Sequence, residues 1–203
     1  MTSPPRTSER APQQARSRES WDRVLKVSME LFEEGGWSGL TITEVCRRAD
    51  VSAPSIYARV DGKAGLFRAA HEQWLLQIEK TERALTADHV REGVSPADAA
   101  TAAALVIIGV FEAHSRALRA LVTRSGDDDE LLDRGGAASR ELLDRLAGTL
   151  PTPTERAEAA LRAVYAECVM RLLYGEHFLM PSPEPDAQFR ERVAALARLI
   201  STA

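Results

Sequence analysis

The sequence predicts an all-α protein, with a small N-terminal domain of three helices followed by a larger helical domain. Ala, Leu and Arg dominate the 203 residues and aromatic residues make up only 5% of them, a composition that suits helices. Apolar residues also recur at helical spacing along most of the chain. We divide the chain into an N-terminal arm at residues 1–17, the three-helix domain at residues 18–64 and the larger helical domain at residues 65–203.

Two short helices with a tight turn between them form the best-marked stretch of the chain. Thr41 and Glu44, three residues apart, have the pattern of a capping box at the start of the first helix. Asp50 falls in the turn, where a residue that tolerates a left-handed backbone is needed. Ser52 is a second N-cap, and Pro54 falls in the first turn of the next helix, where its missing N–H is not needed. This arrangement is typical of a helix-turn-helix.

The outer face of the second helix is small, polar and basic, which suits a DNA groove. Tyr57 and Lys63 offer a hydroxyl and an ammonium to phosphate oxygens, and a backbone N–H of Thr41 or Thr43 near the positive helix end is another such donor. Arg59 either pairs bidentately with a guanine or touches phosphate, and both interpretations stay open. Base contacts are expected from the small and polar residues of the motif, namely Thr43, Ala53, Pro54, Ser55, Ala58 and Arg59.

At these residues the chain resembles a known family. The segment TITEVCRRADVSAPSIYARVDGKAGLF is similar to the DNA-binding motif of tetracycline-repressor (TetR) family regulators. The likeness rests on Thr41 at the helix start, Tyr57 late in the recognition helix and Lys63 followed by an apolar pair. Tyr57 and Lys63 occupy the family's usual phosphate-contact positions. The chain departs from the family pattern at Asp50, Arg59 and Val60, where Gly, His and an aromatic residue are usual.

The resemblance implies a DNA-binding transcriptional regulator. We expect a repressor that a small molecule releases from a palindromic operator. The helices expected at residues 154–178 and 186–201 carry more apolar surface than one buried face needs, and the resemblance implies that they form a four-helix homodimer interface. The rival hypothesis is a helical ligand-binding or scaffold protein that has lost DNA binding. Salt-dependent binding to nonspecific DNA distinguishes the two.

Charge is spread unevenly along the chain. Residues 1–68 contain 11 Lys or Arg against 9 Asp or Glu, whereas the remainder contains 15 against 21, and the whole chain has a net charge of −4. This asymmetry favours a DNA-facing first part. Residues 1–17 are rich in Pro, Ser, Gln and Arg and nearly lack large apolar residues, which predicts a disordered basic arm.

The second domain is expected to hold a ligand cavity. Residues 99–111 are apolar all round, which predicts a central helix. Charged residues are scarce in the helices of this domain, so an apolar small molecule is the expected effector. The candidate lining residues are aromatic or amphipathic and lie in apolar stretches, and each can alternatively be a plain core residue: Trp74, Phe111, His114, Tyr165 and Cys168.

No catalytic residue, metal ligand or cofactor is expected. The chain has no Gly-x-Ser-x-Gly, no phosphate-binding loop and no Cys/His cluster at zinc spacing. Cys46 and Cys168 lie far apart in apolar patterns, which indicates reduced thiols in a cytosolic protein. There is no apolar signal core, and the longest apolar stretch is shorter than the roughly 18 residues of a membrane span. We therefore expect a cytoplasmic protein that does not enter a membrane.

Overall fold

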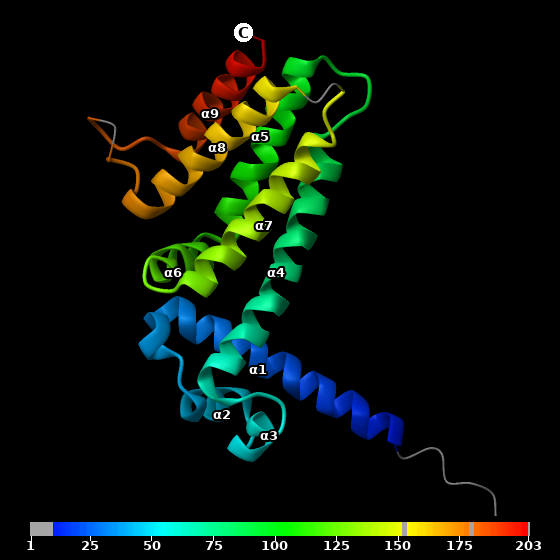
Figure 1. Cartoon of the computed structure of the whole chain (residues 1–203), viewed down its shortest axis with the longest axis vertical. Helices are drawn as coiled ribbons and strands as arrows, with labels where there is room; N and C mark the ends of the chain where they lie inside the picture. Colours follow the sequence, from blue (N-terminus) through cyan, green and yellow to red (C-terminus); the bar gives the residue numbers. More distant parts are fainter. Residues whose placement is uncertain (1–9, 152–153, 179–180, 203) are drawn as a thin grey trace, which may run out of the picture. The chain divides into compact units, whose positions relative to one another are not determined.

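The computed structural model of the chain describes residues 10–151, 154–178 and 181–202. Every regular element within these ranges is a helix (Figure 1), so the predicted all-α class is confirmed. The chain divides into two compact units that meet between Leu75 and Leu76. The helices are α1 (Arg10–Gly39), α2 (Ile42–Ala49), α3 (Ala53–Tyr57), α4 (Gly62–His89), α5 (Pro96–Ala113), α6 (Ser115–Ser125), α7 (Asp129–Ala147), α8 (Glu155–Tyr174) and α9 (Asp186–Thr202).

The first unit packs α1, α2, α3 and the first turns of α4 around a small core. Phe32, Leu40 and Ile56 are completely buried. The ring centroid of Phe67 lies 4.7 Å from that of Phe32 and 5.5 Å from that of Trp37. Because burying a large apolar side chain stabilises a fold by roughly 1.5–3 kcal/mol, these few residues hold the two short helices in place.

The first unit extends further along the chain than the sequence analysis placed it. We expected the second domain to begin at residue 65, but Leu66, Phe67 and Ala70 are buried and belong to the first unit. The boundary was misplaced because α4 continues through it unbroken, with Gly65 inside the helix. A single helix therefore supplies residues to both units.

The helix α1 begins earlier than expected. Residues 1–17 were assigned to a disordered arm, but residues 10–17 are helical, while residues 1–9 lie outside the described part of the chain. The Ala, Gln and Arg residues of this segment have high helix propensity, and Pro12 lies in the first turn, where a missing N–H is tolerated. The side chains of residues 14–19 are exposed. The polar composition therefore marks a helix without a buried face, not the absence of a helix.

The backbone at two turns follows the sequence signals. Asp50 has φ 53° and ψ 57°, and its N–H donates to the carbonyl of Cys46, so the predicted left-handed residue after α2 is confirmed. Gly36 has φ 60° and ψ −153° and interrupts α1. Residues with a side chain rarely adopt that conformation, which explains why the helix bends at a glycine.

The helix α5 forms the centre of the second unit. It packs against α8 and α9, which lie side by side with it (Figure 1). The side chain of Ser95 caps its N-terminus by accepting a hydrogen bond from the N–H of Asp98 at 3.2 Å. Ten of its residues are buried, which confirms the predicted central helix: Ala97, Ala99, Ala100, Ala103, Ala104, Val106, Ile107, Ile108, Val110 and Phe111.

For the second unit the sequence predicts a bend near Ala113 and a helix that is interrupted or loosened at Gly135–Gly136. The chain bends at His114, with φ −120° and ψ 20°, close to the bend expected near Ala113. The expected interruption at Gly135–Gly136 is wrong, because α7 runs through it unbroken. A glycine inside a helix costs only about 1 kcal/mol relative to alanine, and the buried Leu131 and Leu142 anchor the helix on both sides of the pair.

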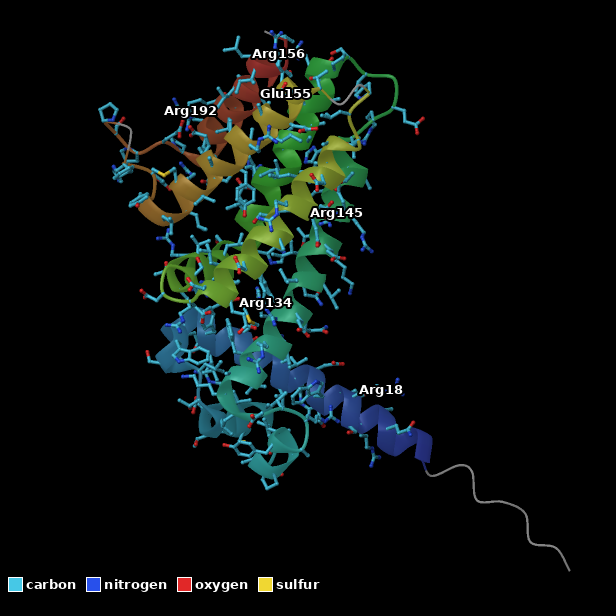
Figure 2. All side chains as sticks on the ribbon, in the orientation of Figure 1. Arg18, Arg134, Arg145, Glu155, Arg156 and Arg192 are labelled. Carbon is cyan, nitrogen blue, oxygen red and sulfur yellow. The ribbon has the colours of Figure 1, made fainter. Side chains whose placement is uncertain are left out.

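A buried carboxylate joins α4 to α7 within the second unit. The side chain of Glu82 is only 6% exposed. It accepts hydrogen bonds from Nε of Arg145 at 2.9 and 3.1 Å and from Nη2 at 2.6 Å (Figure 2 labels Arg145). Because an unpaired buried charge is costly, the two helices depend on this pairing as well as on apolar contact.

Among the described residues, α5 is the one helix long and apolar enough to cross a membrane by length and composition. More than half of it is buried inside the second unit. This is the pattern of a core helix in a soluble fold.

The burial of α5 generates a stability prediction. We expect Ile107→Ala to lower the free energy of unfolding by about 2–5 kcal/mol, because Ile107 is completely buried and the substitution leaves a cavity. The matched control is Leu132→Ala, because Leu132 on α7 is 54% exposed and its loss should change stability by about 0.5 kcal/mol or less. Urea unfolding followed by circular dichroism measures both. Equal losses in the two variants would contradict the placement of α5 at the centre of the core.

Candidate functional site

The start of α2 presents two threonines to solvent. Thr41 is the N-cap residue in extended conformation, and its hydroxyl oxygen accepts a hydrogen bond from the N–H of Glu44 at 3.2 Å. Both Thr41 and Thr43 are exposed. The backbone N–H groups of this first turn carry partial positive charge, so the helix end suits a phosphate oxygen.

Only half of the predicted capping box forms. The Glu44 carboxylate was expected to reach back to the N–H of Thr41, but it accepts hydrogen bonds from Arg47 at 2.6 and 2.9 Å and from Arg48 at 2.9 Å instead. These two guanidiniums lower the pKa of Glu44 to about 2. Arg48 also donates to Glu34 on α1 at 2.8 and 2.9 Å. Carboxylates therefore pair both arginines of α2.

The helix α3 is short and is held by one side chain. Ile56 is completely buried, whereas Tyr57 is 56% exposed. Ser52 takes the N-cap position as expected, but its side chain makes no capping bond. Instead the hydroxyl of Ser55 donates to the carbonyl of Ser52 at 2.6 Å. Pro54 lies in the first turn, as predicted.

Arg59 does not extend freely into solvent. Its Nη2 donates to the carbonyl oxygen of Ser17 at 3.1 Å and to the Oγ of the same residue at 2.6 Å. The centre of the guanidinium lies 4.9 Å from the ring centroid of Trp21. Both partners belong to α1, and the sequence offered no signal for this contact because the residues are 38 or more positions apart.

Lys63 is held in a comparable way. Its ammonium donates to the backbone carbonyl of Trp37 and lies 4.3 Å from the centroid of the Trp37 ring. A carbonyl and an aromatic face orient the ammonium without cancelling its charge. Lys63 is half-buried, so the structure fixes the position of this cation more tightly than that of a surface lysine.

All nine residues predicted to contact DNA lie in the first unit. Most of them are exposed, and the exceptions, Ala53 and Lys63, are half-buried. Their hydroxyls, methyl groups and cations come from the start of α2, from α3 and from the turn before α4. The exposed residues are Thr41, Thr43, Pro54, Ser55, Tyr57, Ala58 and Arg59. Which of the nine residues contacts which part of the DNA stays a prediction.

The comparison with known families identifies this unit. Residues 24–70 match the family model described as bacterial regulatory proteins, tetR family. The match covers α2 and α3 together with the adjoining parts of α1 and α4. The N-terminal unit is a TetR-family domain. The resemblance seen in the sequence is therefore confirmed, and DNA binding is supported.

Solved structures extend the likeness to the whole fold. A transcriptional regulator from Rhodococcus sp. Rha1 has a TM-score of 0.69 at 19% identity, covering 89% of this chain and 95% of that one. A putative TetR-family transcriptional regulator from Rhodococcus sp. has a TM-score of 0.64 at 20% identity, and the match covers 90% of this chain and 99% of that one. A transcriptional regulator from Aquifex aeolicus VF5 has a TM-score of 0.63 at 17% identity, and the match covers 89% of this chain and 99% of that one. The search of curated proteins returned no match. The chain thus has the fold of TetR-family transcriptional regulators.

The five residues predicted to line a ligand cavity do not gather in one place. Trp74 is buried in the first unit, where its ring stacks on that of His71 at 6.0 Å. The other four belong to the second unit. Two of these contact each other, because the rings of Phe111 and Tyr165 meet edge to face at 5.0 Å.

Two polar groups among the candidates have ordinary structural partners. The hydroxyl of Tyr165 lies 2.6 Å from the Oγ of Ser139, and burial raises the pKa of Tyr165. The Nε2 of His114 lies 2.8 Å from the Oγ1 of Thr81, whose hydroxyl donates to the carbonyl of Gln77 at 3.1 Å. Either atom of the pair between Nε2 and Oγ1 can be the donor, according to the tautomer of the imidazole.

A cavity of about 320 Å³ opens between α5, α6, α8 and the region around the start of α9. Phe111 and Cys168 line it, whereas Tyr165 and His114 do not, and a ligand contact of any of them stays a prediction. Its remaining apolar surface comes from Ile108, Leu172 and Phe189. Charged residues from separate helices and loops also line the cavity, which the sequence pattern alone could not bring together. These residues are Glu112, Arg119, Arg171, Glu176 and Asp186.

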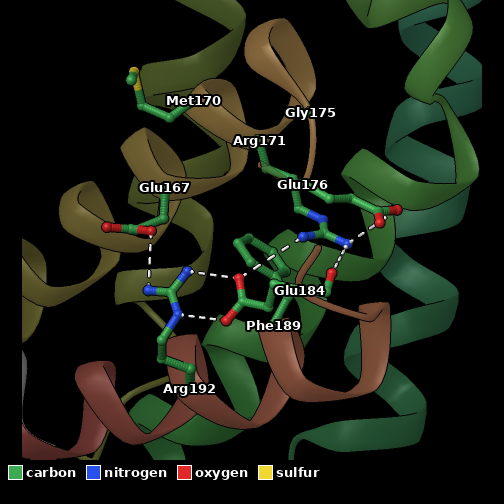
Figure 3. Close-up of a pocket in the computed structure, with 8 residues that line it drawn as sticks. All are labelled: Glu167, Met170, Arg171, Gly175, Glu176, Glu184, Phe189 and Arg192. Atoms are coloured by element: carbon green, nitrogen blue, oxygen red, sulfur yellow. Dashed lines mark hydrogen bonds and ion pairs between the residues drawn. The ribbon is translucent and has the colours of Figure 1, made fainter. Parts of the chain in front are cut away.

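An ion-pair cluster lies beside this cavity and borders a smaller pocket of about 130 Å³ (Figure 3). Glu184, only 4% exposed, accepts hydrogen bonds from Arg192 at 2.7 and 3.1 Å, while its backbone carbonyl accepts one from Arg171 at 2.9 Å. Arg192 lowers the pKa of Glu184. Arg171 also lies 4.6 Å above the ring of Phe189. The cluster therefore fixes the segment before α9 against α8.

The partly buried imidazole of His114 generates a prediction about pH. Burial lowers its pKa in the folded protein, whereas the unfolded side chain titrates near its ordinary value of about 6.5. The unfolded state therefore binds the proton more readily, and stability falls as the pH drops through that value. We expect wild type to lose more stability than His114→Gln between about pH 7 and pH 5.

Urea unfolding at several pH values measures this difference. Glutamine keeps an N–H for Thr81 but does not titrate. The control is His177→Gln, because His177 is exposed and its replacement should leave the pH dependence of wild type unchanged. Parallel stability curves for wild type and His114→Gln would show that the burial of His114 has no energetic effect.

Proposed function

We propose that the protein is a transcriptional repressor that binds a palindromic DNA operator as a homodimer and leaves it when a small molecule binds the second unit. The observation that supports DNA binding most directly is the exposed outer surface of α2 and α3 within a TetR-family domain. Short helices presented in this way fit a major groove. Operator half-sites in adjacent major grooves lie about 34–36 Å apart, so two copies of the unit must act together.

Contacts to DNA divide into phosphate and base contacts. Tyr57, Lys63 and the backbone at Thr41 or Thr43 are assigned to phosphates, because a hydroxyl, an ammonium and helix-end N–H groups all donate to phosphate oxygens. The contact of Lys63 with Trp37 supports this role, because it orients the ammonium. The base contacts are assigned to Thr43, Ala53, Pro54, Ser55 and Ala58, while Arg59 contacts either a guanine or a phosphate.

The phosphate assignment of Lys63 can be tested with a salt series. We expect Lys63→Ala to weaken binding to all DNA sequences alike and to lower the slope of log K against log salt by about one unit, because one phosphate contact is lost. Fluorescence anisotropy with an operator selected from a random pool and with an unrelated duplex measures both quantities. Lys80→Ala, on the exposed part of α4 in the second unit, is the matched control and should change neither.

Two outcomes would count against the proposal. An unchanged affinity and slope for Lys63→Ala would place the DNA-binding surface elsewhere. Absence of any salt-dependent binding by wild type would favour a helical scaffold or ligand-binding protein that has lost DNA binding.

The effector site is assigned to the cavity of about 320 Å³ in the second unit. Its apolar floor, with Ile108, Phe111 and Leu172, supports a mainly apolar molecule. The charged residues at its edge favour a polar group at one end of that molecule. Release follows when the effector binds the DNA-free conformation more tightly than the bound one, through a change in the spacing of the two DNA-binding units. By linkage, operator DNA weakens effector binding by the same factor.

The homodimer interface is assigned to α8 and α9. Leu199 is 67% exposed, and Leu196 and Ile200 on the same helix are half-buried. Val169 on α8 is also only half-buried. Apolar side chains that the second unit leaves partly uncovered on two adjacent helices suit a four-helix contact between two copies.

The dimer proposal predicts the effect of a single charge. We expect Leu196→Glu to give monomers or aggregates, because a carboxylate in an apolar interface loses its hydration without gaining a partner. Sedimentation velocity measures the assembly state. The control is Leu132→Glu, because Leu132 is exposed on α7, outside the assigned interface, and its variant should sediment as wild type does. An unaltered dimer for Leu196→Glu would move the interface to other helices.

A further inference from the structure

The contact between Arg59 and α1 bears on how this residue meets DNA. Ser17 supplies two acceptors to one nitrogen, Nη2, at 3.1 Å and 2.6 Å. The face of the Trp21 ring lies 4.9 Å from the centre of the same guanidinium. All three residues belong to the first unit. Ser17 and Trp21 lie before residue 24, where the match to the TetR-family model begins, so the matched segment does not include these two partners of Arg59.

The choice of nitrogen matters because of the shape of a guanidinium. Arginine can grip the O6 and N7 atoms of guanine with two N–H groups in two ways. One way uses Nη1 and Nη2 at the end of the side chain, and the other uses Nε and Nη2 along its edge. Both ways require an N–H of Nη2. In the structure two acceptors of Ser17 engage that nitrogen, which both pairs of donors need.

The contact leaves other properties of Arg59 intact. The acceptors on Ser17 and the ring of Trp21 are neutral, so they do not cancel the positive charge of the guanidinium. Nε and Nη1 keep N–H groups that can reach single phosphate oxygens. The contrast with Arg47 and Arg48 is clear, because those two guanidiniums are paired with carboxylates.

From this geometry we infer that Ser17 and Trp21 are specificity-determining residues that act through Arg59. By holding Nη2 they suppress guanine readout and leave Arg59 as a phosphate contact. Of the two roles that the sequence left open for this residue, the phosphate contact is then the one it performs. This inference rests on the proposed DNA-binding function and goes beyond it by naming two positioning residues outside the helix-turn-helix.

The test is selection of bound duplexes from a random DNA pool by the full-length protein. We expect Ser17→Ala with Trp21→Leu to acquire a preference for guanine at one position of each half-site, by about tenfold over wild type, which is the discrimination a bidentate pair gives. Ser17→Ala alone should show a smaller gain in the same direction, because the backbone carbonyl remains. Adding Arg59→Ala to the double variant should abolish the gain.

Three controls separate positioning from a general structural effect. Trp21→Phe keeps an aromatic face and should retain the wild-type preference. Ser20→Ala removes a neighbouring hydroxyl on α1 that bonds Arg23, not Arg59, and should also behave as wild type. Thermal unfolding checks that each variant is folded, and exposed Ser17 provides a variant that leaves the core untouched.

The remaining outcomes overturn the inference in distinguishable ways. An unchanged base preference in the double variant would show that the contact does not govern Arg59. Loss of an existing guanine preference would show that Ser17 and Trp21 prepare Arg59 for base reading instead. If wild type selects no sequence and shows no salt-dependent binding, the proposed function fails and this inference fails with it.

Discussion

A five-residue helix cannot hold its shape alone, and the recognition element of this protein depends on the burial of Ile56. Isolated helices shorter than about 12–15 residues are marginal in water, whereas α3 spans only Ala53–Tyr57. Ile56 is completely buried, and the left-handed Asp50 directs the chain from α2 into α3. The exposed side chains of α3 are therefore presented by the first unit as a whole. The burial of Leu40, Val45 and Leu66 in the same core matters to DNA recognition as much as the residues that would touch DNA.

The helix α1 determines which cations of the first unit keep their charge. Its two indole rings contact Arg59 and Lys63, and its backbone and hydroxyl groups accept their hydrogen bonds. Its carboxylate at Glu34 instead joins Glu44 in pairing Arg48. Arg59 and Lys63 thus meet aromatic rings and hydroxyl or carbonyl oxygens of α1, while the arginines of α2 pair with carboxylates. A count of charges along the sequence cannot separate these two groups of cations, because the difference lies in the partner that each cation contacts in the fold.

The sequence predicted those features whose cause is local. The cap at Thr41 and the left-handed Asp50 depend on a few neighbouring residues, and the structure has both. The polar composition of residues 10–17 predicts disorder, whereas the helix propensity of the same residues favours the helix that the structure has. The partners of Glu44 were missed because two guanidiniums compete better for a carboxylate than one backbone N–H. Helical periodicity marks the apolar residues of the cavity as buried, but it cannot bring together charged residues as distant in sequence as Glu112 and Asp186.

The burial of Cys168 limits the kinds of signal that the second unit can receive. Its side chain is nearly inaccessible, and burial raises its pKa to about 12. Peroxides and disulfides react with the thiolate, which this site scarcely populates at neutral pH. Cys46, the other cysteine of the chain, belongs to the first unit. Under the proposed mechanism, a molecule that acts on the second unit is therefore sensed by reversible occupancy and not by oxidation of Cys168.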